Sequence, residues 1–165
     1  MPNPQNLQNP KNKDFNIKIY FTTCLIFMTL FDFTLTDYIL NNISSLSDCC
    51  KYVNIVYIEN TGAAFSFFEH STVLLIIISL LAVLYIIWKL LCTRVRYSPA
   101  FYFFISILSA GIFCNTFERI TLGYVRDFIS LKYPDFPVFN ISDILINLGV
   151  FAIICLIITK KYLKK

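Results

Sequence analysis

Two aspartates, Asp127 and Asp143, stand out in this sequence because they are acidic groups set between apolar segments. They occur in the phrases Gly-Tyr-Val-Arg-Asp-Phe at 123–128 and Phe-Asn-Ile-Ser-Asp at 139–143. Only 15% of the residues are charged, and a carboxylate beside a membrane is costly without a partner or a function. Two carboxylates in contact hold one proton between them, so that the ionised one can activate water while the protonated one polarises a carbonyl. Such a pair would suit hydrolysis of a peptide bond.

Each aspartate also has an ordinary structural explanation. Asn140 followed three residues later by Asp143 is the pattern of a helix N-cap with an acidic residue in the first turn. Asp127 could form a loop ion pair with Arg126 or Lys132. Taken one at a time, neither acid decides the function.

The composition as a whole places the chain in a membrane. Hydrophobic residues make up 57% of its 165 residues and the mean hydropathy is +0.66, whereas soluble domains carry about 25% charged residues. Four apolar runs, at about 17–38, 72–88, 97–117 and 144–159, approach the roughly 20 residues that cross a bilayer. We expect an all-α membrane protein, a bundle of four transmembrane helices, in a single domain over residues 17–165. Residues 1–16 are expected to form a disordered cytoplasmic tail.

The basic residues predict the orientation of the four spans, because lysine and arginine favour the cytoplasmic side. Ten of the 14 lie in the N-terminal tail, in the connection between the second and third spans, or at the C-terminus: Lys11, Lys13, Lys18, Lys89, Arg94, Arg96, Lys160, Lys161, Lys164 and Lys165. Both termini are therefore expected in the cytoplasm. The first and third connections would then face outward.

The two outer connections are predicted to hold a small extracytoplasmic β element. Residues 52–58, Tyr-Val-Asn-Ile-Val-Tyr-Ile, have the β-branched and aromatic content of a strand. Residues 59–62 are typical of a turn, and residues 63–68 of a second short strand. In the other outer connection, Pro134 and Pro137 bracket aromatic residues that suit a membrane interface.

Further polar residues converge on the same outer side, which marks a candidate functional site. Besides the two aspartates they are Asp32, Asn60, Asn115, Arg119 and Asn140. Gly111, Asn115 and Arg119 are four residues apart and share a helix face, where the glycine permits close helix contact. Asp32 near a helix C-terminus needs a cation, and we predict Arg119 as its partner. Asn60 before Gly62 would also suit a turn, and Arg119 could also extend to lipid headgroups.

Metal and disulfide chemistry are not indicated. The six cysteines form no Cys-x-x-Cys motif and four of them lie within or at the end of apolar runs, where a cysteine is a small apolar filler. A single histidine, His70, cannot form a metal cluster. We expect no metal, no cofactor and no nucleic-acid partner.

Five phrases, in their order and spacing, resemble the motifs of bacterial lipoprotein signal peptidase, the signal peptidase II family. They are Glu-Asn-Thr-Gly-Ala-Ala-Phe at 59–65, Gly-Ile-Phe-Cys-Asn at 111–115, Glu-Arg at 118–119, and the two aspartate phrases at 123–128 and 139–143. The resemblance covers the chain from about Asp32 to Gly149. Five ordered motifs on four predicted spans make chance a poor explanation.

The resemblance implies an aspartic endopeptidase of the bacterial inner membrane. We expect it to need no cofactor, to act as a monomer and to have membrane lipids as further partners. Such enzymes remove the signal peptide from a prolipoprotein by cutting before a cysteine that carries a diacylglyceryl group. Asp127 and Asp143 match the two catalytic aspartates of the family. The family positions that line the site match Asn60, Gly62, Asn115, Arg119 and Asn140. Asp32 and Gly111 would be structural residues near the site.

Two positions depart from the family pattern. The family usually has Asp followed four residues later by Lys in the first helix, whereas here Asp32 is followed by Thr36. The third motif is usually Asp-Arg, whereas here it is Glu118-Arg119. Both changes affect local ion pairing rather than the aspartate pair.

Three other interpretations are open at this point. A proton or ion carrier would need polar groups through the whole membrane depth, and the inner halves of the spans carry almost none. A non-enzymatic membrane subunit could use the acids to bind a partner. A degenerate peptidase could have lost activity through Thr36. Only an active peptidase predicts cleavage that depends on the lipid and on both aspartates.

Overall fold

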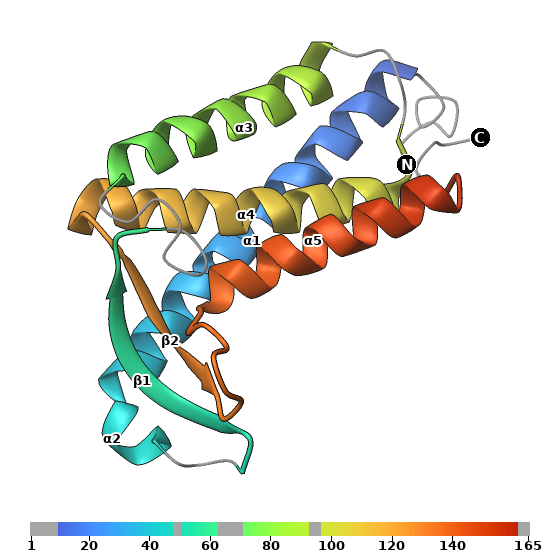
Figure 1. Ribbon diagram of the computed structural model, residues 1–165. Helices are drawn as coiled ribbons and strands as arrows, with labels where there is room; N and C mark the ends of the chain where they lie inside the picture. Colours follow the sequence, from blue (N-terminus) through green and yellow to red (C-terminus); the bar gives the residue numbers. More distant parts are fainter. Residues whose placement is uncertain (1–9, 48–50, 63–70, 93–96, 162–165) are drawn as a thin grey trace, which may run out of the picture.

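The computed structural model describes residues 10–47, 51–62, 71–92 and 97–161 (Figure 1). In chain order its elements are α1 (Pro10–Asn41), α2 (Ile43–Leu46), β1 (Val53–Asn60), α3 (Thr72–Cys92), α4 (Pro99–Leu122), β2 (Val125–Leu131) and α5 (Ile141–Ile158). Within the described residues, four helices are long and apolar enough to cross a membrane, namely α1, α3, α4 and α5. The predicted class, a helical membrane protein with a small β element, is confirmed.

Helix α4 is the centre of the bundle. It packs against α1, α3 and α5, and it runs between them in Figure 1. In its most apolar stretch 56% of the residues are buried, against 0% in α3. Ser98 caps the start of α4 by accepting the N–H of Phe101 at 3.2 Å, and Gly123 ends it in the left-handed conformation that glycine favours.

Two glycines allow α4 and α5 to pack closely. A Cβ on Gly111 would lie 2.5 Å from the carbonyl oxygen of Ser142, which confirms the predicted close approach at this residue. A Cβ on Gly149 would lie 2.8 Å from Cβ of Leu108. Each of the two helices therefore contributes one glycine at which the other helix approaches closely.

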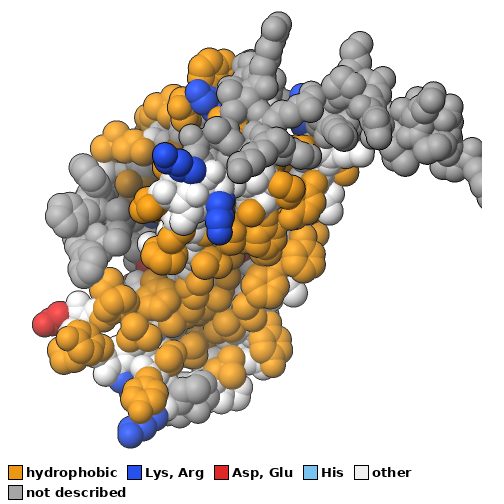
Figure 2. Space-filling model, turned by 90° about the vertical axis from the view of Figure 1, so that its right-hand side faces the viewer, with side chains coloured by type: hydrophobic (Ala, Val, Ile, Leu, Met, Phe, Trp, Pro, Cys, Tyr) orange, Lys and Arg blue, Asp and Glu red, His pale blue; other side chains and the backbone are white. Residues whose placement is uncertain are grey.

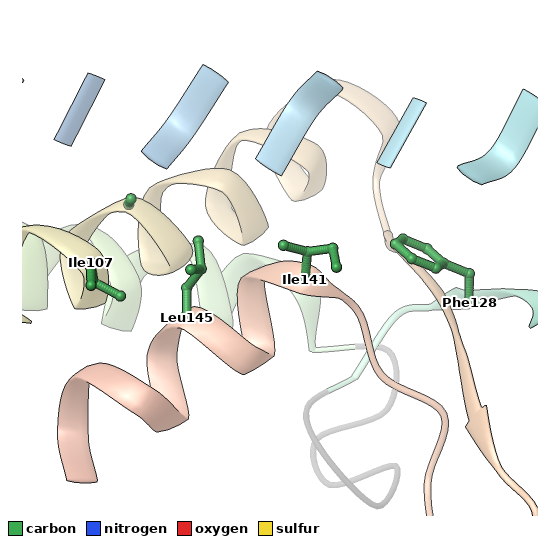
Figure 3. Close-up of a cluster of buried hydrophobic side chains, with 5 residues drawn as sticks. Ile107, Phe128, Ile141 and Leu145 are labelled. Atoms are coloured by element: carbon green, nitrogen blue, oxygen red, sulfur yellow. The ribbon is translucent and has the colours of Figure 1, made fainter. Parts of the chain in front are cut away.

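A buried apolar cluster joins the helices to β2. It consists of Ile107, Ala110, Phe128, Ile141 and Leu145. In Figure 3, side chains from α4, α5 and β2 contribute to this one cluster. The strand residue Phe128 is fully buried there. Because Phe128 follows Asp127 directly, the core fixes the strand beside the acid.

The β element is a two-stranded antiparallel sheet of β1 and β2. Its register places Ile58 opposite Asp127 and Asn60 opposite Val125. The strand predicted at 52–58 is confirmed, but residues 59 and 60 continue it rather than forming a turn. Its partner is β2. The paired residues are 65 or more positions apart in the sequence, so local sequence patterns do not reveal the pairing. The second strand predicted at 63–68 lies outside the described residues.

The N-terminal boundary also differs from the prediction. Helix α1 begins at Pro10, so residues 10–16 are helical rather than disordered. Proline is well suited to the first helical position, since the N–H it lacks would have no partner inside the helix. The lysines and asparagines that follow are tolerated in a helix that the apolar span already stabilises. Residues 1–9 lie outside the described residues.

One face of the molecule is covered by hydrophobic side chains, as Figure 2 shows, with lysine and arginine side chains gathered near its ends. Such a band matches the acyl region of a bilayer between two polar interfaces. The arrangement agrees with four helices of membrane-spanning length.

Candidate functional site

Asp127 and Asp143 come from different elements that a short bridge ties together. Asp127 lies in β2 and Asp143 in the first turn of α5. Just before α5, Phe139 pairs with Ile129 of β2. The N–H of Ile129 donates to the Phe139 carbonyl at 2.8 Å, and the N–H of Phe139 donates back at 3.1 Å. This bridge brings the start of α5 to the strand that carries Asp127.

Asn140 is bonded to both aspartates. Its side-chain amide donates to Asp127 Oδ1 at 2.8 Å, and its backbone N–H donates to Asp143 Oδ2 at 3.3 Å. Its side-chain oxygen accepts the N–H of Asp143 at 2.9 Å, which completes a capping box at the start of α5. The helix-cap explanation of this pair is therefore confirmed, and the same contacts link the two acids.

Two further asparagines orient the acids. Asn60 donates to Asp127 Oδ2 at 2.7 Å, and Asn115 donates to Asp143 Oδ1 at 2.9 Å. Asn140 also donates to the amide oxygen of Asn115 at 3.1 Å. Each of the four carboxylate oxygens thus accepts one asparagine N–H. Hydrogen bonds of this kind hold a carboxylate in a fixed direction and stabilise its charge.

Asp127 is almost completely buried, with 2% of its surface exposed. Its pKa is raised to about 7, chiefly by this burial and also by the nearby charge of Asp143. The hydrogen bonds from Asn60 and Asn140 and the charge of Arg119 act in the opposite direction. Burial wins because removing a carboxylate from water disfavours its charged form more than two amide donors favour it. Near neutral pH, Asp127 is therefore poised to carry a proton.

Arg119 approaches the site from α4. Its Nη2 donates to the carbonyl of Gly62 at 2.7 Å, and its Nη1 donates to the carbonyl of Asn115 at 3.4 Å. Its Nε is buried and has no hydrogen-bond partner among the described residues. Gly62 itself is held by its N–H, which donates to the side chain of Asn60 at 2.9 Å. The predicted residues Asn60, Gly62 and Arg119 thus form one connected group.

The predicted ion pair between Asp32 and Arg119 is wrong. Asp32 is buried and accepts the hydroxyl of Ser142 at 2.6 Å and that of Thr36 at 3.4 Å. Two hydroxyl groups donate hydrogen bonds to this carboxyl group, in place of the ion pair with a cation that the sequence predicted. Asp32 therefore ties α1 to the first turn of α5, one residue before Asp143. Sequence reasoning missed Ser142, although a small polar residue at a helix start was visible.

The possible ion pair between Asp127 and Arg126 is not formed, because Arg126 is bonded elsewhere. Its backbone N–H donates to Glu118 Oε2 at 2.8 Å, its Nη2 lies 2.6 Å from Glu118 Oε1, and its Nη1 lies 3.1 Å from Asp37 Oδ1. Glu118 is buried in α4, whereas the Asp37 side chain is 62% exposed. Glu118 thus fixes the backbone directly before Asp127. The sequence singled out Glu118 only as a departure from a motif.

The aspartates open onto a cavity of about 960 Å³. Its polar end is lined by Asn60, Asn115, Arg119, Asp127 and Asp143. Its remaining wall comes mainly from apolar side chains: Leu75, Ile112, Val125, Phe136, Pro137, Val138, Phe139, Ile144, Ile146, Leu148 and Phe151. Ser79 and Asn147 are the polar members of that wall. The cavity therefore joins a polar end that holds both aspartates to an apolar slot.

Within the described part of the chain, no group of histidine, cysteine, aspartate or glutamate side chains could hold a metal ion. His70 lies outside the described residues. Cys24, Cys114 and Cys155 are free thiols.

Comparison with known proteins agrees with the geometry. Residues 24–159 match the family model described as Signal peptidase (SPase) II. The lipoprotein signal peptidase of Thermodesulfovibrio yellowstonii is 31% identical over 141 residues, which cover 82% of this chain and 92% of the relative. That of Clostridium tetani is 34% identical over 110 residues, covering 65% and 70%. A solved structure, "Bacterial membrane enzyme structure by the in meso method at 2.3 A resolution", superposes with a TM-score of 0.74 at 27% identity, covering 85% and 88%.

Proposed function

This chain belongs to the signal peptidase II family, and we propose that it cleaves the signal peptides of prolipoproteins with Asp127 and Asp143 as an aspartic catalytic pair. The observation that carries the proposal is that both acids line one cavity and are joined through Asn140. An ion pair with a basic residue would explain one acid at a time, but it would not explain why two acids line the same cavity. A shared proton and a water-activating role give that reason.

The two acids have different environments, which suggests different roles. Asp127, with a pKa of about 7, is the proton donor. Asp143 lies in the first turn of α5, where the helix dipole stabilises a negative charge. Asp143 is therefore the base. Because the two groups interact, the measured pKa values belong to the pair.

The reaction needs only these groups and a water. Asp143 takes a proton from the water, whose oxygen attacks the scissile carbonyl carbon while Asp127 gives its proton to the carbonyl oxygen. When the C–N bond breaks, Asp143 passes its proton to the leaving amine. Asp127 regains a proton from the hydroxyl of the new carboxyl group. Both acids return to their starting states.

Arg119 and Asn115 are suited to hold the substrate backbone near the cut. The unpaired, buried Nε of Arg119 is a costly group that a substrate carbonyl would satisfy. Asn115 lines the same end of the cavity and orients Asp143. The apolar wall would take the acyl chains of a diacylglyceryl cysteine, which matches the requirement for a lipidated substrate.

We also propose the placement of the enzyme in the bacterial inner membrane. In Figure 1 the start of α1 and the end of α5 lie at one end of the bundle and the sheet lies at the other. In the sequence, ten of the 14 basic residues fall early in α1, from the last turn of α3 to the start of α4, or after α5, and the positive-inside rule assigns these segments to the cytoplasm. The catalytic pair would then face the outer side. Residues 17–165 would act as one peptidase domain and as a monomer.

Cleavage assays on purified variants test the catalytic pair. Asp127→Asn and Asp143→Asn should each lower kcat by at least about a thousandfold on a diacylglyceryl prolipoprotein, because either change removes the shared proton. An unlipidated precursor should be cut poorly by the wild type. The matched control is Asp135→Asn, a nearby acid with positive φ that asparagine also tolerates. Near-normal cleavage by either catalytic variant would overturn the assignment.

A further inference from the structure

Two polar residues, Ser79 and Asn147, interrupt the apolar wall of the cavity. Ser79 lies in α3 and is the only polar residue between Thr72 and Tyr85. Asn147 lies in α5, one turn deeper than Asp143, in a segment otherwise made of apolar residues up to Thr159. Both line the same cavity. Polar groups at membrane depth are expensive unless they serve a partner or a ligand.

Ser79 differs from the hydroxyl residues of the neighbouring helix. In α4, Ser106, Ser109 and Thr116 each return the hydroxyl to a carbonyl of their own helix, at 2.6 to 2.7 Å. This local bond is how a helical hydroxyl is usually satisfied in an apolar setting. Among the described residues, Ser79 makes no such bond. Its hydroxyl is left to the cavity.

Asn147 also keeps an unused donor. One N–H of its amide goes to the carbonyl of Asp143 at 2.9 Å. The amide carries two N–H groups, so a second donor remains. No hydrogen bond of that second N–H is found within the part of the chain that the structure describes. The two helices therefore present two hydrogen-bond donors to one apolar slot.

The depth of these donors selects the substrate group they meet. Asn147 is four residues beyond Asp143, which is about 6 Å along a helix axis. A signal peptide crossing this depth as a helix satisfies its own backbone groups. The ester carbonyls of a diacylglyceryl group, by contrast, accept hydrogen bonds and have none of their own. They lie a few bonds deeper than the cysteine beside the cut.

We propose that Ser79 and Asn147 form an ester-binding subsite, which donates hydrogen bonds to the ester carbonyls of the substrate's diacylglyceryl group. This inference rests on the proposed function. The subsite positions the lipid, and through it the peptide bond, against the aspartates. Phe151, one turn deeper than Asn147, then contacts the start of the acyl chains. It makes the enzyme selective for ester-linked over ether-linked lipid.

Two synthetic prolipoprotein peptides that differ only in this linkage test the subsite. One carries a diacylglyceryl cysteine and the other a dialkylglyceryl cysteine with ether bonds. The wild type should prefer the ester substrate in kcat/KM by about tenfold, the effect of one to two net hydrogen bonds. Ser79→Ala and Asn147→Leu should each lower this preference several-fold, and the double variant should abolish it. Tyr85→Phe removes a hydroxyl from α3 outside the cavity lining and should keep the preference.

The outcomes separate the subsite from the catalytic pair. Equal kcat/KM of the wild type on both substrates, with Asp127→Asn inactive, would overturn the subsite and leave the pair intact. A loss in Ser79→Ala that is the same on both substrates would also overturn it, in favour of a contact with the peptide. Activity of Asp127→Asn on either substrate would instead contradict the catalytic pair.

Discussion

The two ends of the interface between α4 and α5 are held together in different ways. At the end beside the β sheet, which we call the outer end of this interface, hydrogen bonds join Asn115 to Asp143 and to Asn140. Further in, Gly149 packs directly against Leu108. Hydrogen bonds fix the distance and direction of particular atoms, whereas close packing fixes shape and volume. The outer end of this interface therefore orients the catalytic groups, and its inner end stabilises the fold. We expect changes at the outer end to alter kcat and changes at the inner end to alter the free energy of unfolding.

Among changes to the residues that hold the two acids in place, the largest effect is expected from Asn140→Ala, which removes the residue that joins them. Its amide bond to Asp127 and its cap on α5 are both lost. We expect kcat to fall about a hundredfold, because the acids lose their common orientation. Loss of the cap should also lower the free energy of unfolding by about 1 kcal/mol. Single-turnover cleavage and thermal unfolding measure the two effects.

Ser98→Ala is the matched control for that change. Ser98 caps α4 at the other end of the bundle through a single bond to Phe101. Its loss should cost a similar free energy of unfolding, about 1 kcal/mol, with no change in kcat. An equal loss of kcat in Asn140→Ala and Ser98→Ala would mean that Asn140 affects kcat only by stabilising a helix.

A smaller effect is expected from Glu118→Gln, which weakens the anchor of β2. Glu118 accepts both the backbone and the guanidinium of Arg126. Because it touches neither substrate nor the acids, it acts by positioning Asp127. We expect kcat to fall about tenfold with KM within about twofold of the wild type, and Glu118→Asp to restore part of the loss.

Asp37→Asn tests whether Glu118 acts by positioning the strand or only by pairing with the charge of Arg126, because Asp37 also pairs with Arg126. Asp37 contacts the other face of Arg126 but is 62% exposed. Water screens such a pair, so its removal should change the free energy of unfolding by less than about 1 kcal/mol and leave kcat near that of the wild type. An equal loss of kcat in both variants would point to the charge of Arg126 rather than to the backbone anchor.

The smallest effect on catalysis is expected from Gly149→Ala, at the inner end of the interface. The new methyl group would meet backbone and side-chain atoms of Leu108 at 2.8 to 3.0 Å. The helices must shift, which should lower the free energy of unfolding by about 1–2 kcal/mol. The folded fraction should keep its kcat. A loss of kcat without a loss of stability would contradict the division of tasks.

Much of this arrangement could be predicted because it follows from local patterns. The four spans are visible as apolar runs. The cap at Asn140 and Asp143 is a spacing rule, and the shared face of Gly111, Asn115 and Arg119 is helical periodicity. These features depend on neighbours in sequence, which physical rules of helices already relate.

The parts that could not be predicted depend on partners distant in sequence. The choice of Ser142 rather than Arg119 by Asp32 is decided by which helix start lies beside α1. The pairing of β1 with β2 brings Asn60 to Asp127 across 67 residues. Composition gave a strand at 52–58 but no means of choosing its neighbour. Tertiary packing, which local rules do not contain, makes both choices.

The central claim, that Asp127 and Asp143 hold one catalytic proton, is tested most directly by the pH dependence of kcat/KM on a lipidated prolipoprotein. The pKa of Asp127 is raised to about 7 by burial. Because its protonated form is the active one, kcat/KM should fall about tenfold per pH unit above about pH 7. Asp135→Asn should show the same profile. A rate that stays level up to about pH 9 would contradict the shared proton.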